Sequence, residues 1–168
     1  EITFRGEKVL DYDQEESALY RNKNIGFVFQ DHLLLPYLTV KENILLPLLA
    51  SKTTDTEFMQ KVDESVRMME GTGISGIADK YPYQISGGEA QRATLVRALV
   101  NKPSILLADE PTGSFDRKNA VNLGDLLIRM NIDYGITLIL ATHSEELAGK
   151  MKIQYTLSEG KLISGNKI

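Results

Sequence analysis

Residues 105–110 read Ile-Leu-Leu-Ala-Asp-Glu, an apolar run that ends in two adjacent carboxylates. A continuous apolar run of this kind is typical of a strand that is buried on both faces of a parallel sheet. Ligands of open α/β sheets bind beyond the carboxyl ends of the strands. The sequence therefore predicts that Asp109 and Glu110 lie at a ligand-binding edge.

A second informative stretch precedes this strand. Residues 85–92 read Ile-Ser-Gly-Gly-Glu-Ala-Gln-Arg. Ser86 with Glu89 three residues later forms the pattern of a capping box, which predicts a helix start. Free amide groups at a helix start favour a phosphate, and Gly87 and Gly88 would let it approach closely. A plain capping box after a loop is the alternative explanation for most such sequences.

Strands alternate with helices in the second half of the chain, which indicates a parallel α/β sheet. The apolar runs 105–108 and 136–141 predict two strands that are buried on both faces, and 24–29 predicts a third strand. Shorter elements complete the expected order. They are strands at 2–4 and 8–10, a closing hairpin over 153–163, and helices at 13–20, 117–131 and 145–150.

The stretch from about 38 to 95 is mainly helical and is expected to form a subdomain of its own. Four apolar residues of the predicted helix 55–70 recur at helical spacing and should share one buried face. They are Phe58, Val62, Val66 and Met69. The expected organisation is a first core part over 1–37, the helical subdomain over 38–95, and a second core part over 96–168.

Polar residues follow three of the predicted strands. Gln30 follows 24–29, Asp109 and Glu110 follow 105–108, and His143 follows 136–141. Because the carboxyl ends of parallel strands meet at one edge, these side chains predict a single site. One carboxylate could hold Mg²⁺, and the other could orient or deprotonate water. Taken singly, each has a plainer explanation: a solvated carboxylate pair or a surface histidine.

Composition excludes several classes of protein. The chain has 168 residues, no cysteine and a net charge of −4. The lack of cysteine excludes a disulfide scaffold and a cysteine-ligated metal. The lack of a basic excess argues against a broad nucleic-acid surface. No apolar run approaches the roughly 18 residues that a membrane span requires.

Taken in order, these motifs resemble those of the nucleotide-binding subunit of an ATP-binding cassette (ABC) transporter, over essentially the whole chain. Gln30 in Phe-Val-Phe-Gln resembles the Q-loop glutamine, 85–92 the signature motif, and 105–111 Walker B. Ser114-Phe115-Asp116 stands where the D-loop belongs, and His143 where the switch histidine belongs. The stretches 34–48 and 108–116 most resemble the branch that serves lipoprotein release and macrolide export.

The resemblance implies an ATPase that uses ATP and Mg²⁺ and has a P-loop NTPase-like parallel core with a helical subdomain. It assigns catalysis to Glu110 and His143, and Mg²⁺ binding to Asp109 and Gln30. Nucleotide contacts would come from Gln30, Ser86, Gly87, Gly88, Glu89 and Asp116. The implied partners are a transmembrane permease and a second copy of the subunit, without nucleic acid, in the cytoplasm at the inner face of the membrane.

The sequence departs from the family pattern at several places. Ile85 and Glu89 replace the commoner leucine and glutamine, and the D-loop carries Phe115 where leucine is usual. No Gly-x-x-x-x-Gly-Lys-Ser/Thr phosphate loop occurs in the chain, although the family places this Walker A loop upstream of the position of Glu1. We therefore expect a chain that is truncated at its N-terminus, lacks the N-terminal strands and the Walker A helix, and is inactive alone. We also expect strand 105–109 to have lost a neighbour.

Two alternatives remain open. The chain could be a docking module that binds a partner without hydrolysis, or an ABC ATPase that works outside membrane transport. The segment 30–86 is too short for the coiled-coil insertion of the DNA-repair members, and the chain shows no tandem second cassette like that of the translation factors. The transported substrate is not encoded here, because the membrane subunit selects it.

Overall fold

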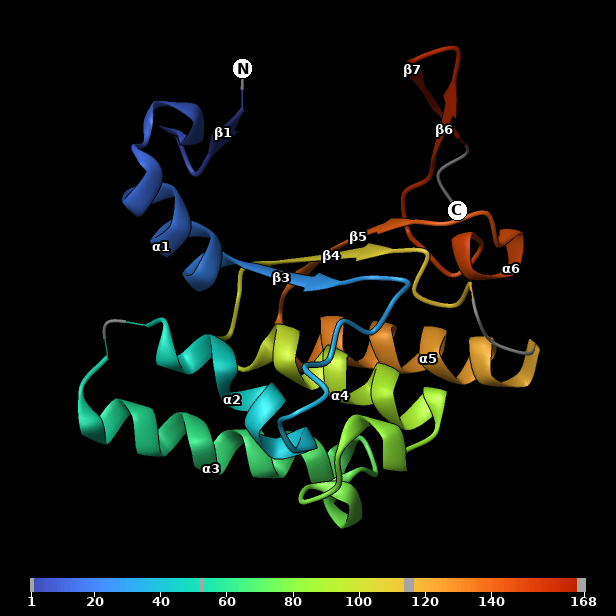
Figure 1. The fold of residues 1–168 in the computed structure, drawn as a ribbon. Coiled ribbons are helices and arrows are strands. Elements are labelled where there is room, and N and C mark those ends of the chain that lie inside the picture. The colour runs from blue at the N-terminus through green and yellow to red at the C-terminus, as the bar shows by residue number, and fades with distance from the viewer. Residues whose placement is uncertain (1, 52, 114–116, 166–168) are drawn as a thin grey trace.

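A three-stranded parallel sheet forms the centre of the computed structural model, which describes residues 2–51, 53–113 and 117–165. The strand order is β3–β4–β5, formed by Ile25–Val28, Ile105–Asp109 and Thr137–Ala141. Helices pack against one face of this sheet, and none of the described residues forms a helical layer on the opposite face (Figure 1). The predicted α/β class with a parallel sheet is confirmed.

The predicted helices are all present, with shifts of a few residues at their ends. They are α1 (Gln14–Asn24), α2 (Val40–Leu49), α3 (Asp55–Gly71), α4 (Gly87–Leu99), α5 (Arg117–Tyr134) and α6 (Glu145–Ala148). Short 3-10 turns cover Val9–Asp11, Ser75–Ile77 and Pro82–Gln84. Two antiparallel hairpins pair β1 (Thr3–Phe4) with β2 (Glu7–Lys8), and β6 (Tyr155–Ser158) with β7 (Lys161–Ser164).

The expected strand at 8–10 is wrong beyond Lys8. The residues Val9–Asp11 form a 3-10 turn, although the amide of Val9 still donates to the carbonyl of Ile2, directly before β1, at 3.2 Å. A 3-10 turn thus replaces strand pairing at Val9, and the chain then enters α1. Asp13 then caps that helix.

Capping boxes set the starts of α2, α3 and α4. Thr39, Thr54 and Ser86 each accept a hydrogen bond from the backbone amide of a glutamate three residues later, and that glutamate accepts one from the cap amide in return. This exchange satisfies amide donors that a helix start leaves free. The helix start predicted at Ser86 is therefore confirmed.

The predicted buried face of α3 is wrong at one residue, Val66. Phe58 and Val62 are half-buried and Met69 is buried, but Val66 is exposed, and Ser65 takes the buried position instead. At 3.6 residues per turn, Val66 lies about 80° from Phe58 around the helix, whereas Ser65 lies about 20° from it. Val66 therefore stands at the margin of the buried face.

One buried cluster joins the sheet to the helical stretch. Val28 of β3, Ile44 of α2, Leu95 of α4 and Leu106 of β4 belong to it. The contact between β3 and α4 is especially close at Gly26, where an added Cβ would lie 2.3 Å from the carbonyl oxygen of Ala98. Only glycine lets the strand and the helix approach this closely.

The prediction that strand 105–109 has lost a neighbour is wrong. Ile105 is in register with Ile25 on one side and with Thr137 on the other, so β4 is the central strand. Among the described residues, the strands with an open edge are β3 and β5. Sequence alone does not specify the lateral order of parallel strands, and this is why the expectation failed.

The prediction that 136–141 is buried on both faces is also wrong. Along β5, exposed and half-buried residues alternate, and Ile139 is 53% exposed. The register aligns Phe27, Leu107 and Ile139 across the three strands. These three residues form an apolar row on the face of the sheet that the helices leave uncovered.

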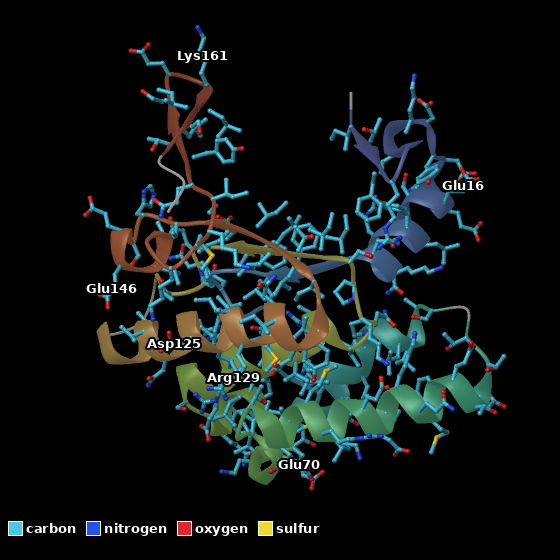
Figure 2. All side chains as sticks on the ribbon, turned by 180° about the vertical axis from the view of Figure 1, so that it is seen from behind. Glu16, Glu70, Asp125, Arg129, Glu146 and Lys161 are labelled. Atoms are coloured by element: carbon cyan, nitrogen blue, oxygen red, sulfur yellow. The ribbon has the colours of Figure 1, made fainter. Side chains whose placement is uncertain are left out.

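The uncovered face lies between two projecting parts of the chain. Figure 2 shows Glu16 on α1 to one side of the sheet and Lys161, at the tip of the β6–β7 hairpin, to the other. The N-terminal side is held together by aromatic contacts, with Tyr20 packed edge-on against Phe4 at 5.8 Å between ring centroids. In the described part of the chain, no helix is long and apolar enough to cross a membrane.

Candidate functional site

The ends of β4 and β5 bring Glu110 and His143 together. The carboxylate Oε1 of Glu110 lies 3.5 Å from Nε2 of His143, and its Oε2 accepts a hydrogen bond of 3.4 Å from the hydroxyl of Thr142. The Glu110 side chain is 23% exposed, whereas that of His143 is 99% exposed. The glutamate is therefore partly sheltered, and the histidine can approach a ligand from solvent.

The backbone of Glu110 adopts an uncommon conformation. Its φ of +42° lies in the left-handed region, where a residue with a side chain costs about 1–3 kcal/mol. The amide of Glu110 donates to the carbonyl of Ala141 at 2.9 Å, and its carbonyl accepts from the amide of Gly113 at 3.0 Å. These bonds hold the strained peptide and fix the direction in which the carboxylate leaves the sheet.

Gln30 reaches the loop that follows Glu110. It stands two residues beyond β3, and its carboxamide packs against Gly113, where an added Cβ would lie 3.2 Å from Cδ of Gln30. Asp109 ends β4 and is exposed. The structure thus places Gln30, Asp109, Glu110 and His143 at the carboxyl edge of one sheet, as their positions in the sequence predict.

The metal ligands predicted at this edge are a carboxylate oxygen of Asp109 and the amide oxygen of Gln30. Among the described residues, no group of three or more His, Cys, Asp or Glu side chains could hold a metal ion. Mg²⁺ is commonly held by one or two protein carboxylates together with phosphate oxygens and water. The donors therefore fit a magnesium ion that arrives with a nucleotide, and do not form a metal cage of their own.

The signature stretch forms a separate part of the candidate site. Ser86 and Gly87 are exposed and Gly88 is half-buried at the start of α4. The Ser86 hydroxyl donates to Oε2 of Glu89 at 2.7 Å, and the Ser86 amide donates to the same oxygen at 2.8 Å. These two bonds, the hydroxyl first, lower the pKa of the Glu89 carboxyl. None of the described hydrogen bonds joins this helix start to Glu110.

Asp116, the remaining predicted nucleotide contact, lies outside the described residues, as do Ser114 and Phe115. Beside this edge of the sheet, a cavity of about 290 Å³ opens between the loop after β4, α5 and α6. Glu110 and His143 line it together with Gly113, Val121 and Leu147. Figure 2 labels Asp125 on α5 and Glu146 on α6, and residues of both helices line this cavity.

Sequence reasoning missed two contributors to the site. Thr142 bonds to Glu110, and its only signal is its place directly before His143. Gln91 lies within the quoted stretch 85–92, yet its part in the site is not visible from the sequence. Its side chain is buried and bonds both to His32 and to the carbonyl of Pro111, directly after Glu110.

Comparison with known proteins agrees with this arrangement. The family model described as "ABC transporter" matches residues 1–113. The chain belongs to the ABC transporter family. Membership identifies it as part of an ABC-type ATPase, and the predicted family and ATPase class are confirmed.

Curated ABC relatives carry names from lipoprotein release. The chain is 40% identical over 163 residues to "Lipoprotein-releasing system ATP-binding protein LolD 1" of Rhodopirellula baltica. The matched region covers 96% of this chain and 69% of that protein. It is also 40% identical over 162 residues to LolD of Myxococcus xanthus, over 96% of the chain and 71% of that protein. The predicted resemblance to the lipoprotein-release branch is thereby confirmed.

Solved ABC structures share the fold. The ATP-binding cassette MJ0796, in a dimeric post-hydrolysis state bound to ADP and Pi, has a TM-score of 0.77 at 33% identity, over 95% of this chain and 69% of that one. The cbiO1 protein of Clostridium perfringens, part of the transporter complex cbiONQ, has a TM-score of 0.84 at 28% identity, over 98% of this chain and 65% of that one. The ABC chain is thus an ATP-binding cassette in fold as well as in sequence.

Proposed function

We propose that this ABC chain carries the hydrolytic centre of a transporter's ATP-binding subunit, which pairs with a second copy around ATP and powers a membrane permease. The observation that carries the proposal is the contact between Glu110 and His143 at the ends of two neighbouring parallel strands. A carboxylate and an imidazole that converge on one sheet edge, beside a cavity, are suited to activate water and steady a phosphoryl group.

Glu110 is proposed as the residue that orients and deprotonates the attacking water. Its carboxylate is partly sheltered, and the hydrogen bonds to Ala141 and Gly113 hold the backbone of Glu110 in place. A general base must be held within hydrogen-bond reach of the proton that it accepts. His143 stands at the open side of the carboxylate, from which its ring can donate a hydrogen bond to the transferred phosphate.

Asp109 and Gln30 are proposed to hold Mg²⁺ together with the nucleotide phosphates. The ion would neutralise charge that develops on those phosphates during hydrolysis. Gln30 also begins the segment that leads to α2, so it links this edge to the helical region. We accordingly propose that 38–95 acts as a helical subdomain between two core parts, 1–37 and 96–168.

The start of α4 is proposed to contact the terminal phosphate of a nucleotide that a second copy binds. The exposed Ser86 and Gly87 and the helix dipole support this role. The Ser86 hydroxyl now donates its single proton to Glu89, so it must leave Glu89 in order to donate to a phosphate. Asp116 is proposed to lie at the seam between the two copies.

We propose a permease partner of the lipoprotein-release branch and a location at the inner face of the cell membrane; the names of the relatives support the choice of branch. The chain itself contains no phosphate-cradling Gly-Lys-Ser/Thr loop. We propose that hydrolysis therefore requires such a loop to be present in the working protein, and that the 168 residues alone are inactive. The docking-module alternative differs, because it predicts partner binding without any hydrolysis.

The deciding experiment uses the full-length protein that carries this chain. Glu110→Gln should abolish Mg²⁺-dependent hydrolysis and accumulate an ATP-bound dimer, because water activation is lost while phosphate binding remains. Glu70→Gln is the matched control, since Glu70 is exposed at the end of α3, and it should leave turnover unchanged. Phosphate release and light-scattering mass are the measurements. Hydrolysis by Glu110→Gln within a few-fold of the wild type would overturn the proposal.

A further inference from the structure

Gln91 is a buried polar residue for which the proposed hydrolysis has assigned no role. It lies in α4, five residues after the exposed Ser86, and its side chain is 1% exposed. Burial of a primary amide costs several kcal/mol, on the order of 2–7, unless the amide is hydrogen-bonded. Both ends of this amide are bonded, and both partners lie outside α4.

The two bonds fix the orientation of the amide. Nε2 of Gln91 donates to the carbonyl of Pro111 at 3.0 Å, so Oε1 faces Nδ1 of His32 at 2.5 Å. An amide oxygen can only accept, and Nδ1 of His32 must therefore carry the proton in this contact. Gln91 is thus a junction between two segments that are far apart in sequence.

Both segments adjoin residues of the proposed site, Gln30 as a Mg²⁺ ligand and Glu110 as the catalytic carboxylate. His32 stands two residues after Gln30, and Pro111 directly follows Glu110. The peptide around Glu110 is strained and is held on its other sides by Ala141 and Gly113. A shift of the Pro111 carbonyl would therefore alter the direction of the Glu110 carboxylate.

A second side chain of α4 holds the same segment after Gln30. The guanidinium of Arg97 donates to the carbonyls of Leu33 at 2.7 Å and His32 at 3.0 Å. Burial lowers the pKa of this guanidinium. Leu33 has a left-handed φ of +47°, so the backbone at this contact is locally constrained. The segment and α4 are thereby linked at two levels of the helix.

We propose that Gln91 is a positioning residue, which ties the signature helix α4 to both the segment after Gln30 and the peptide after Glu110. A movement of the signature end would then reach the catalytic carboxylate through one buried amide. The inference rests on the proposed function, because it concerns the same hydrolysis. It adds a residue that would act through His32 and Pro111 and not by a contact of its own with nucleotide or water.

The test is Gln91→Met in the full-length protein. Methionine keeps the length and the approximate volume of glutamine and removes both hydrogen bonds. We expect kcat for ATP hydrolysis to fall on the order of 10- to 100-fold, with KM for ATP within about twofold, because a small misplacement of a catalytic group has this size of effect. Gln60→Met is the matched control, since Gln60 is exposed on α3, and it should leave both constants unchanged.

A pair of variants at His32 tests the same junction from the half-buried loop, where substitution is better tolerated than in the core. Asparagine places an amide nitrogen near the position of Nδ1, whereas leucine has a similar shape and no donor. His32→Asn should retain most of kcat, and His32→Leu should lower it several-fold. Equal activity of the two variants would overturn the proposal, even if Gln91→Met fails to fold.

The outcomes also separate this inference from the proposed function. If Glu110→Gln abolishes hydrolysis while folded Gln91→Met keeps the wild-type kcat, the positioning role is wrong and the proposed function stands. If Glu110→Gln still hydrolyses ATP, the proposed function itself falls. Gln91→Met could also lose stability and activity per molecule in parallel. If His32→Asn were then no more active than His32→Leu, Gln91 would be a structural residue only.

Discussion

Glu110 and His143 face each other across 3.5 Å, yet they are anchored in very different ways. The glutamate is partly sheltered, and the backbone on both sides of it is hydrogen-bonded. The histidine ring is almost wholly in solvent and has no comparable support. Glu110, which is held in place, is therefore suited to orient water. His143, which is exposed, is suited to bind a phosphate that arrives and leaves.

This contrast predicts that the two residues separate activity from stability. His143→Ala in the full-length protein should lower kcat about 100-fold or more, as loss of a group that stabilises the transition state does. Because the ring is exposed, the free energy of unfolding should change by no more than about 0.5 kcal/mol. Steady-state phosphate release and chemical denaturation measure the two quantities. A normal kcat would make His143 an ordinary surface residue.

The capping box of the signature helix predicts a pH dependence. Ser86 lowers the pKa of Glu89 below its ordinary value of 4.5. The ionised carboxylate therefore contributes stability that is fully present above the unfolded-state pKa and is lost as the pH falls through the lower, folded-state pKa. Ser86→Ala removes the largest cause, so the Glu89 carboxyl should titrate closer to 4.5.

Carbon NMR of the Glu89 carboxyl would follow this titration, with Ser51→Ala as a control that removes a serine far from Glu89 in sequence. Glu89→Gln should flatten the decline in unfolding free energy below about pH 4.5, because the amide does not titrate in this range. An unchanged Glu89 midpoint in Ser86→Ala would show that the hydroxyl does not set the pKa.

The close approach of β3 to α4 predicts a large difference between two glycine substitutions. Gly26→Ala would put a Cβ 2.3 Å from the backbone oxygen of Ala98, which cannot move without shifting the helix. The expected loss is about 1–3 kcal/mol or more. Gly71→Ala is the control, since an added Cβ there meets nothing within 4 Å. It should be neutral or slightly stabilising in urea unfolding, and comparable losses at both sites would contradict the packing argument.

A substitution on the exposed surface after Gln30 should affect transport without affecting ATP hydrolysis. Tyr37 is 89% exposed in the segment between Gln30 and α2. If this surface contacts a permease, Tyr37→Asp should reduce transport while basal ATP hydrolysis persists. Glu42→Lys is less informative, because Glu42 closes the capping box of Thr39 and its loss would weaken α2 itself. Loss of basal hydrolysis in Tyr37→Asp would instead indicate a folding defect.

We expect the 168-residue chain alone to bind Mg-ATP weakly or not at all. Backbone amides and a lysine of the phosphate loop supply the main grip on phosphates in P-loop proteins, and the chain contains no such loop. Ser86, Gly87, Gly88 and Asp109 add contacts to a nucleotide that is already held. Isothermal titration with Mg-ATP should therefore show weak binding or none. Micromolar affinity would mean that a nucleotide site exists without the loop.

Local patterns predicted the elements well because their causes are local. The capping box of Ser86 fixes the start of α4, and the apolar run before Asp109 marks β4. The burial of β5 could not be predicted in the same way. An apolar run looks alike in a covered strand and in an edge strand, and only the neighbouring layers decide whether Ile139 meets protein or solvent.

The candidate site was predictable only in part, for the same reason. Residues that end parallel strands are brought to one edge by topology, so Gln30, Glu110 and His143 could be grouped from their order in the chain. The junction at Gln91 depends on the side chains of Gln91 and His32, on the backbone carbonyl of Pro111, and on the rotation of α4. Helical periodicity does not specify a buried amide or its partners.

The register of the central sheet has a consequence for the order in which the chain folds. β3 is in register with β4, although the whole stretch of α2, α3 and α4 separates them in sequence. Contacts between such distant segments carry a high loop-closure entropy and form slowly, whereas helices form from near neighbours. We expect the helices to appear first as the chain leaves the ribosome. Phe27 would then remain without its partner strand until Leu107 has been synthesised, which makes this interval the time when the chain most needs a chaperone.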